Sequence, residues 1–281
     1  MPELRPFLSG LAFPESPRWH AGALWFSDFY RQRVQRADAD AAVETVAELD
    51  DQPSGLGWLP DGRLLVVGMT KRQLLRLDPD GLHVAAELHA WAPAHCNDML
   101  VDPQGRAYVG NFGFDLPRRA PFAPTVLLVV DAGGGVRVAA RDLHFPNGMA
   151  LADEGRTLLV AESYGQRLTA FTRHADGSLH DRRTWAQFDG RVGPDGICID
   201  AQGAVWIASP VSREVLRVRE GGEVTHRIAT ADQAVACALG GTDGRTLYVC
   251  TGRVMVTPEQ SRAALGGAIW QARVEVPAAA A

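Results

Sequence analysis

Four oxygen-bearing side chains occupy equivalent positions in a repeated sequence pattern. Asn97, Asn147 and Asp195 each lie eight residues before a turn glycine. Glu15 lies seven residues before the turn glycine of the first repeat, which is one residue shorter. If the fold brings these positions together, two carboxylates and two amides converge, and a cation between them would relieve their repulsion and satisfy their acceptors. We therefore predict a metal site at these four residues.

The ligand types favour a hard divalent cation. The set offers only oxygen atoms and contains neither Cys nor His. This chemistry favours calcium and leaves magnesium, manganese, zinc and iron open, because geometry rather than affinity alone decides which metal a site binds. A competing interpretation is that Asn147 and Asp195, each between a proline and a glycine, only form turns. The shared spacing of all four residues favours the metal.

A repeat of six units must position these side chains. A turn glycine followed by a short apolar run recurs at intervals of roughly 40 to 50 residues, at Gly22, Gly62, Gly105, Gly155, Gly203 and Gly244. A second strand-like run follows each one, and helical periodicity is hard to find. Units of this length with several short strands are typical of propeller blades. The sequence predicts an all-β fold, a six-bladed β-propeller with four-stranded antiparallel blades.

The last unit lacks an outer strand of its own. Outer runs follow the third strand in other units, at residues 43–49, 83–88, 136–143 and 223–229. Residues 3–9 precede the first blade without a partner, so we predict that the N-terminal segment closes the last blade and removes an exposed edge. No linker or change of composition interrupts the series, and residues 1–281 are expected to form a single domain.

The innermost strand of each blade should be the apolar run just before its turn glycine. Blades are related by rotation about the propeller axis, so equivalent positions of the inner strands form a ring around the central channel. Residues far apart along the chain thereby become neighbours at the channel mouth.

Composition restricts the partners. The 281 residues are 46% hydrophobic with a net charge of −5, which gives no electrostatic reason to expect nucleic acid. The chain begins without a basic, apolar leader and has no run of roughly 18 apolar residues, so we expect a cytoplasmic protein without a membrane partner. The four cysteines show no C-x-x-C spacing and are interpreted as structural thiols. A small-molecule substrate and a monomer or weak homo-oligomer are expected.

Four motifs resemble the senescence-marker-protein, gluconolactonase and luciferin-regenerating-enzyme family. They are Phe13-Pro-Glu-Ser-Pro-Arg-Trp19, Asn97-Asp98 followed by Pro103-x-Gly105-Arg106, Phe145-Pro-Asn-Gly148 and Gly193-Pro-Asp-Gly196, and the resemblance extends from about residue 10 to residue 276. It implies a propeller with a divalent metal in its channel and hydrolysis of sugar lactones or related esters. It also implies metal ligands at Glu15, Asn147 and Asp195, with Asn97 contacting metal or substrate and Asp195 acting in acid/base chemistry.

The chain departs from the family pattern near the substrate. Ser16 stands where sugar lactonases usually have glycine, and His95 stands where they often have an arginine that holds substrate oxygens. The resemblance marks Asn97 and Asp115 as candidate substrate-binding residues, with Asp115 near a substrate-contacting carboxylate of the family. His95 is the only histidine beside a motif residue, and we expect it to contact the substrate or to shuttle a proton. The missing arginine leaves the metal site intact but weakens the case for aldonolactones.

The residues support metal-assisted hydrolysis by water. The chain has no G-x-S-x-G nucleophile motif. A divalent cation can polarise a lactone carbonyl, and Asp195 is the candidate catalytic residue that positions or deprotonates the water. Two alternatives stay open: an organophosphate or aryl-ester hydrolase with the same metal site, and a calcium-binding propeller without catalytic activity.

Overall fold

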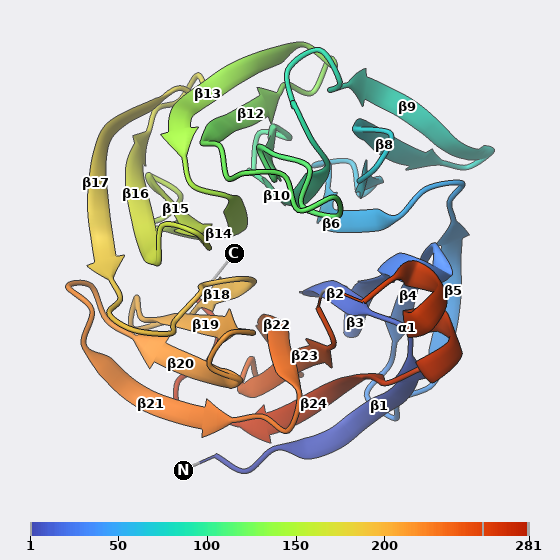
Figure 1. Ribbon diagram of the computed structural model, residues 1–281, viewed down its shortest axis with the longest axis vertical. Helices are drawn as coiled ribbons and strands as arrows, with labels where there is room; N and C mark the ends of the chain where they lie inside the picture. Colours follow the sequence, from blue (N-terminus) through green and yellow to red (C-terminus); the bar gives the residue numbers. More distant parts are fainter. Residues whose placement is uncertain (1, 255, 280–281) are drawn as a thin grey trace.

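The chain forms six four-stranded antiparallel sheets arranged around a central axis (Figure 1). This computed structural model describes residues 2–254 and 256–279. The arrangement is a six-bladed β-propeller, which confirms the predicted fold.

Each blade is built from an inner, a second, a third and an outer strand. The inner strands are β2 (Pro14–His20), β6 (Pro53–Trp58), β10 (Cys96–Val101), β14 (Pro146–Ala152), β18 (Ile197–Ile199) and β22 (Gln233–Gly240). The second strands are β3 (Ala23–Asp28), β7 (Leu64–Gly68), β11 (Ala107–Asn111), β15 (Thr157–Glu162), β19 (Val205–Ser209) and β23 (Thr246–Gly252). The third strands are β4 (Arg33–Ala37), β8 (Gln73–Asp78), β12 (Thr125–Val130), β16 (Arg167–Arg173), β20 (Glu214–Val218) and β24 (Gly267–Arg273). The outer strands are β5 (Val43–Glu48), β9 (Gly81–Glu87), β13 (Val136–Leu143), β17 (Leu179–Gln187), β21 (Val224–Ala229) and, for the last blade, β1 (Arg5–Leu11).

The turn glycines explain the repeat in physical terms. All six adopt positive φ angles, from 69° at Gly244 to 87° at Gly62, in the turn that joins an inner strand to a second strand. Side chains rarely tolerate this region of backbone space, whereas glycine enters it without steric cost. The same backbone turn recurs in each blade, so the same residue recurs in the sequence.

The N-terminal strand closes the ring. β1 pairs antiparallel with β24 at the rim of the last blade, with Arg5 opposite Gln271 (Figure 1). The ring of Phe7 packs edge-on against Tyr248, with 5.1 Å between the ring centroids. The predicted closure is confirmed, and β24 has a partner on both edges.

The hydrophobic core lies between blades. Leu159 of β15, Ile207 of β19 and Leu216 of β20 belong to one buried cluster that joins two neighbouring blades. The second strands β7 and β19 are buried along their whole length because both faces pack against other sheets. Because both faces are buried, the sequences of these strands are continuously apolar and do not alternate between apolar and polar residues.

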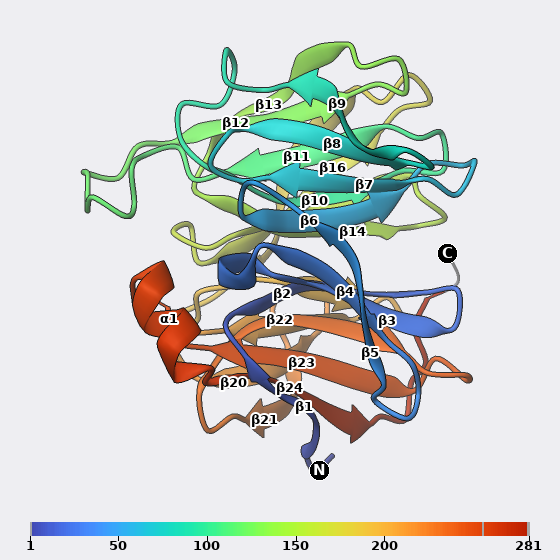
Figure 2. The same ribbon diagram turned by 90° about the vertical axis from the view of Figure 1, so that its right-hand side faces the viewer.

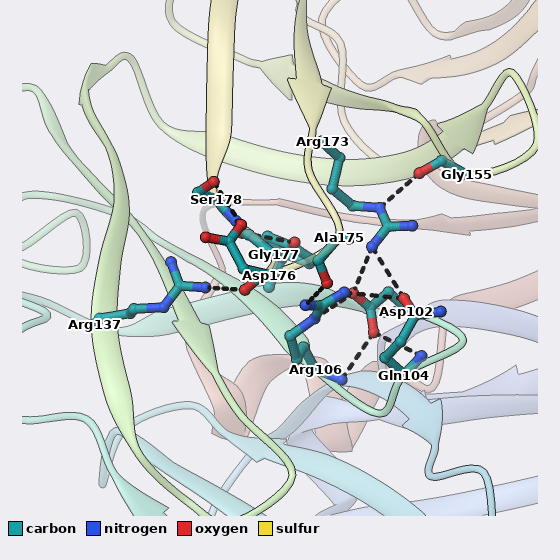
Figure 3. Close-up of polar contacts among 11 residues, drawn as sticks. Asp102, Gln104, Arg106, Arg137, Gly155, Arg173, Ala175, Asp176, Gly177 and Ser178 are labelled. Carbon is teal, nitrogen blue, oxygen red and sulfur yellow. Dashed lines mark hydrogen bonds and ion pairs between the residues drawn. The ribbon is translucent and has the colours of Figure 1, made fainter.

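A buried polar network joins the third and fourth blades (Figure 3). Asp102, in the turn after β10, accepts hydrogen bonds of 2.7 Å from Arg106 Nε and 2.9 Å from Arg173 Nη1. Arg106 Nη1 also donates to the Ala175 oxygen at 2.6 Å, and Arg173 Nε donates to the Gly155 oxygen at 2.6 Å. One carboxylate therefore ties the turn of one blade to two arginines from different blades.

The sequence patterns did not predict a helix, but the described residues include α1 (Pro258–Ala264) and the short 3-10 helix η1 (Phe29–Arg31). Thr257 and Gln260 form a reciprocal capping box at the start of α1, and Pro258 is its first residue. This signal was present in the sequence, but seven residues are too few to show helical periodicity. No described helix is both long enough and apolar enough to span a membrane.

We call the face at which the inner strands begin the leading face. The α1 helix and the loop between β11 and β12, residues 112–124, project from this face (Figure 2). Ser261 Oγ of α1 donates to the Ala12 oxygen at 2.9 Å, which attaches the helix to the first blade.

Candidate active site

The inner strands place the predicted ligands at the leading face. Glu15, Asn97 and Asn147 are each the second residue of their strand, in β2, β10 and β14. Asp195 lies two residues before β18, and its backbone oxygen accepts a hydrogen bond of 3.2 Å from the Gly148 amide. Gly148 permits this approach, because a Cβ atom there would lie 2.6 Å from the same oxygen. A common strand register thus sets the position of all four residues.

The two amides are joined directly. Asn97 Nδ2 donates to Asn147 Oδ1 at 3.0 Å, and Asn97 Oδ1 accepts from Ser54 Oγ at 3.4 Å. Asn147 Nδ2 donates to Ser163 Oγ at 3.2 Å, and that hydroxyl donates to the Pro194 oxygen at 2.7 Å. These bonds orient the amides from blades three and four and connect them to the residue that precedes Asp195.

The two carboxylates share an environment that disfavours their charge. Burial raises the pKa of Glu15 well above its ordinary value, and the negative charge of Asp195 raises it further. Burial also raises the pKa of Asp195, with a second contribution from Asp98, although a hydrogen bond from Asn147 opposes the shift. Both side chains lie deep among protein atoms yet keep part of their surface accessible. Carboxylates in this setting need a counter-charge if both are to ionise.

Arg18 does not supply that counter-charge, because it is bound to Asp98. Arg18 Nη2 donates to Asp98 Oδ1 at 2.7 Å and to the Met99 oxygen at 2.8 Å. Ser16 Oγ also donates to Asp98 Oδ1, at 3.3 Å. The ion pair links the first blade to the third, and the charge of Arg18 lowers the pKa of Glu15 by less than the other influences raise it.

The donor set fits a hard divalent cation. Glu15 and Asp195 provide carboxylate oxygens, while Asn97 and Asn147 provide amide oxygens held in place by hydrogen bonds. Calcium accepts both ligand types. The four residues would place a cation between the two carboxylates, where it would favour their ionised forms.

A second acidic group lies away from this site. Asp78, Asp80 and His83 cluster around the turn between β8 and β9, and the last two are exposed. Arg76 Nη2 already donates to Asp78 at 2.6 Å. Exposed clusters of this kind are common without an ion, so we assign no function to it.

His95 and Asp115 lie outside the inner strands that carry Glu15, Asn97 and Asn147. The His95 oxygen accepts from the Phe112 amide at 2.9 Å, and the two rings lie 5.7 Å apart. Burial lowers the pKa of His95 by more than the charge of Asp115 raises it, which favours a neutral ring. The Asp115 carboxylate contacts Arg118 at 3.4 Å on the exposed loop. Its influence on His95 is electrostatic, and their substrate contacts stay a prediction.

Several polar residues near the site were not predicted as functional. Ser163 follows the end of β15, whose Glu162 lies opposite Pro146 in the sheet register. The sequence did hold one signal for Ser163: it is a polar residue at the end of a second strand, and that end lies opposite the start of the inner strand that carries Asn147. Nothing in the local sequence indicated the pairing of Arg18 with Asp98, because they lie in blades one and three.

Comparison with known proteins identifies a family. Residues 13–253 match the family model described as SMP-30/Gluconolactonase/LRE-like region. A 6-deoxy-6-sulfogluconolactonase of Pseudomonas putida is 27% identical, over 95% of this chain and 92% of the relative. Pentonolactonase XacC of Haloferax volcanii is 24% identical, over 84% of this chain and 80% of the relative. A solved luciferin-regenerating enzyme, 18% identical, covers 100% of this chain and 98% of its own with a TM-score of 0.85, which supports the fold.

Proposed function

Because the chain belongs to the SMP-30/gluconolactonase/LRE-like family, we propose that it is a divalent-metal-dependent hydrolase that opens a lactone with water. One observation carries the proposal: the charge of Asp195 acts on the largely buried Glu15 carboxylate, while Asp195 accepts a hydrogen bond from Asn147, which also accepts one from Asn97. A cation would offset the cost of ionising these two carboxylates. Two relatives that match most of the chain are named as lactonases. The proposed substrate is a small molecule, a sugar lactone or related cyclic ester, and calcium is the favoured metal.

The side chains would divide the work of hydrolysis. When bound, a divalent cation supplies Lewis-acid polarisation of the lactone carbonyl. Asp195 holds the attacking water by accepting its hydrogen, takes the proton as the new C–O bond forms, and returns it to the ring oxygen as the ester C–O bond breaks. The product is a hydroxy acid. Asn97 orients the substrate beside Asn147, and His95 contacts its remaining part.

The first prediction concerns Asp195. Asp195→Asn preserves the shape of the side chain but removes its ability to accept a proton, so we expect lactone hydrolysis to fall by about 100-fold or more while the circular dichroism spectrum stays unchanged. Chelation should abolish wild-type hydrolysis, and added Ca²⁺ should restore it. Hydrolysis is followed by the acid released from γ- and δ-lactones.

Asp50→Asn is the matched control. Asp50 is also on the leading face, but its carboxylate is exposed and pairs with Lys71. The lactonase activity of Asp50→Asn should equal that of the wild type. Full activity in Asp195→Asn, or activity indifferent to exhaustive chelation, would contradict the proposal.

A second candidate function uses the same site. His95 occupies the position at which sugar lactonases often have a charged arginine, and burial lowers its pKa and favours a neutral ring. A neutral side chain at this position suits a less polar ester, so an aryl-ester or organophosphate hydrolase is the second candidate. A panel that includes lactones, aryl esters and phosphotriesters separates the two activities. Failure to hydrolyse any of them, with a melting temperature that still falls on chelation, would instead indicate a calcium-binding propeller without catalysis.

A further inference from the structure

Five aromatic side chains on the leading face form one contact cluster, in which four rings stack and Phe114 packs edge-on or tilted against its neighbours. We call this cluster the aromatic wall: Phe112, Phe114, Phe122, Phe145 and Tyr164. Ring centroids lie 4.6 Å apart for Phe112 and Phe145, and 5.3 Å apart for Phe145 and Tyr164. Phe122 and Tyr164 lie 5.5 Å apart and nearly parallel, at an interplanar angle of 7°. These spacings are typical of favourable ring contacts. The wall therefore presents connected ring surfaces from blades three and four.

The wall begins beside the candidate metal ligands. Phe145 lies two residues before Asn147 and has a φ of 62°, a left-handed conformation that is costly for a residue preceding proline. Ser163, which accepts a hydrogen bond from Asn147, is followed directly by Tyr164. A substrate whose ester group reaches Asn147 would extend its remaining part along these rings.

Exposure increases toward the outer end of the wall. Phe114 and Phe145 are buried, whereas Phe122 is 42% exposed and Tyr164 is 48% exposed. Adjacent exposed rings leave apolar surface in water that contact with a ligand would remove. The outer end is thus the part of the wall that is available to a substrate.

Two carboxylates near the wall, Glu162 and Asp115, already have arginine partners. Glu162 accepts from Arg167 Nη2 at 2.8 Å and from Arg182 Nη2 at 3.2 Å. Asp115 and Arg118, in the loop that carries Phe122, form an ion pair with each other. A substituent rich in hydroxyl groups would have to compete with the arginines for these two carboxylates, whereas an apolar ring could pack on Phe122 and Tyr164 without doing so.

We propose that the aromatic wall binds a flat apolar substituent of the substrate, so that the preferred lactone carries an aryl group or a similar planar group in place of hydroxyl groups. The inference rests on the proposed lactone hydrolysis and names the substituent that the same site selects. Phe122 and Tyr164 are specificity-determining residues in this proposal. Their exposed faces would stack against the substituent while the ester group lies at Asn147 and Asp195.

Three lactones that share one reacting ring test the proposal: γ-butyrolactone with phenyl, methyl or hydroxymethyl at its γ carbon. We expect kcat/KM for the phenyl compound to exceed that for the other two by about tenfold, the magnitude expected of one aromatic contact. Phe122→Ala should reduce the ratio of phenyl to methyl kcat/KM several-fold, and Tyr164→Ala provides an independent second variant. Both positions are exposed, so truncation should leave folding intact.

Trp91→Ala is the matched control. Trp91 is 44% exposed, close to the values of Phe122 and Tyr164, and lies in the loop between β9 and β10 on the same face but outside the aromatic wall. Its phenyl-to-methyl ratio should equal that of the wild type. An equal loss in Trp91→Ala, or a wild-type ratio near one, would overturn the inference even if all three lactones were hydrolysed.

Binding of lactams separates this inference from the proposed function. The γ-phenyl and γ-methyl lactams keep the ring shape but resist hydrolysis, and calorimetry gives their Kd values with the Ca²⁺-loaded protein. The wild type could bind the phenyl lactam more tightly than the methyl lactam, and Phe122→Ala could lose this preference, while no lactone is hydrolysed. That result would support binding at the aromatic wall and contradict the proposed hydrolase activity. Equal Kd values for the two lactams would reject the wall whatever the activity.

Discussion

Glu15 and Asp195 hold their carboxyl groups where ionisation is costly. The folded protein raises the pKa of both groups, first through burial and then through a neighbouring carboxylate. Between the ordinary pKa and the raised one, the folded state therefore binds more protons than the unfolded state. By linkage, the free energy of unfolding contributed by these groups falls as pH rises through that interval. A bound cation would remove this loss by stabilising the ionised carboxylates.

The second prediction follows at this residue scale. In the metal-free protein, the free energy of unfolding should decrease as pH rises above 4.5, the ordinary pKa of a glutamate carboxyl group such as that of Glu15. Glu15→Gln removes one of the two charges, so its metal-free form should lose less stability and exceed the metal-free wild type near pH 8. Ca²⁺ should stabilise the wild type more than the variant. Urea unfolding at several pH values, with chelator or with Ca²⁺, measures all three effects, and parallel curves for the two proteins would contradict the expectation.

Buried ion pairs join strands and turns within blades and between them, in addition to apolar packing. Asp102 has a fully buried carboxylate that receives both Arg106 and Arg173 (Figure 3). Asp200 repeats part of this arrangement in blade five, where it accepts from Arg217 Nε at 2.7 Å. In both turns the carboxylate also accepts backbone hydrogen bonds, so one side chain organises the turn and anchors an arginine.

The third prediction concerns this element. Asp102→Asn leaves two largely buried guanidinium groups without their negative partner, and we expect it to lower the free energy of unfolding by about 3–5 kcal/mol. Asp243→Asn is the control, since the pair of Asp243 with Arg273 is exposed and screened by water, so its loss should lower the free energy of unfolding far less. Urea unfolding compares the variants. Equal losses would show that the buried network has no special role in stability.

At the scale of the whole molecule, the ring is closed by strands from opposite ends of the chain. β1 contributes the outer strand of a blade whose other three strands, β22, β23 and β24, come from the C-terminal part. An unpaired outer strand offers free backbone groups to another chain. We therefore expect closure by β1 to limit self-association as well as to stabilise the fold.

The fourth prediction removes the closing strand. Deletion of residues 1–11 should expose the edge of β24, lower the melting temperature and promote self-association because free strand edges pair with other chains. Size-exclusion chromatography and thermal unfolding measure these effects. A synthetic peptide of residues 2–11 should restore the wild-type behaviour, whereas a peptide of the same composition in scrambled order should not. A monomeric deletion variant with unchanged melting temperature would show that closure by β1 is dispensable.

The sequence alone was sufficient for the fold and for the register of the candidate site. Each turn glycine adopts a positive φ angle, and this local requirement leaves a visible repeat. Counting from these glycines located Glu15, Asn97, Asn147 and Asp195 at the start of inner strands or just before one, and the unpaired N-terminal run indicated ring closure. These features depend on local backbone geometry and strand periodicity, and both are determined by residues that are close together in the sequence. The ligand roles themselves stay predictions.

Only the tertiary structure revealed which side chains meet across blades. The pairing of Arg18 with Asp98, the support of Asn147 by Ser163, and the aromatic wall all join residues from separate parts of the chain. Their contacts depend on the packing of neighbouring blades and on the path of long loops. Neither spacing nor composition records that packing, because the same side chains in the same order could face solvent under a small change of loop conformation.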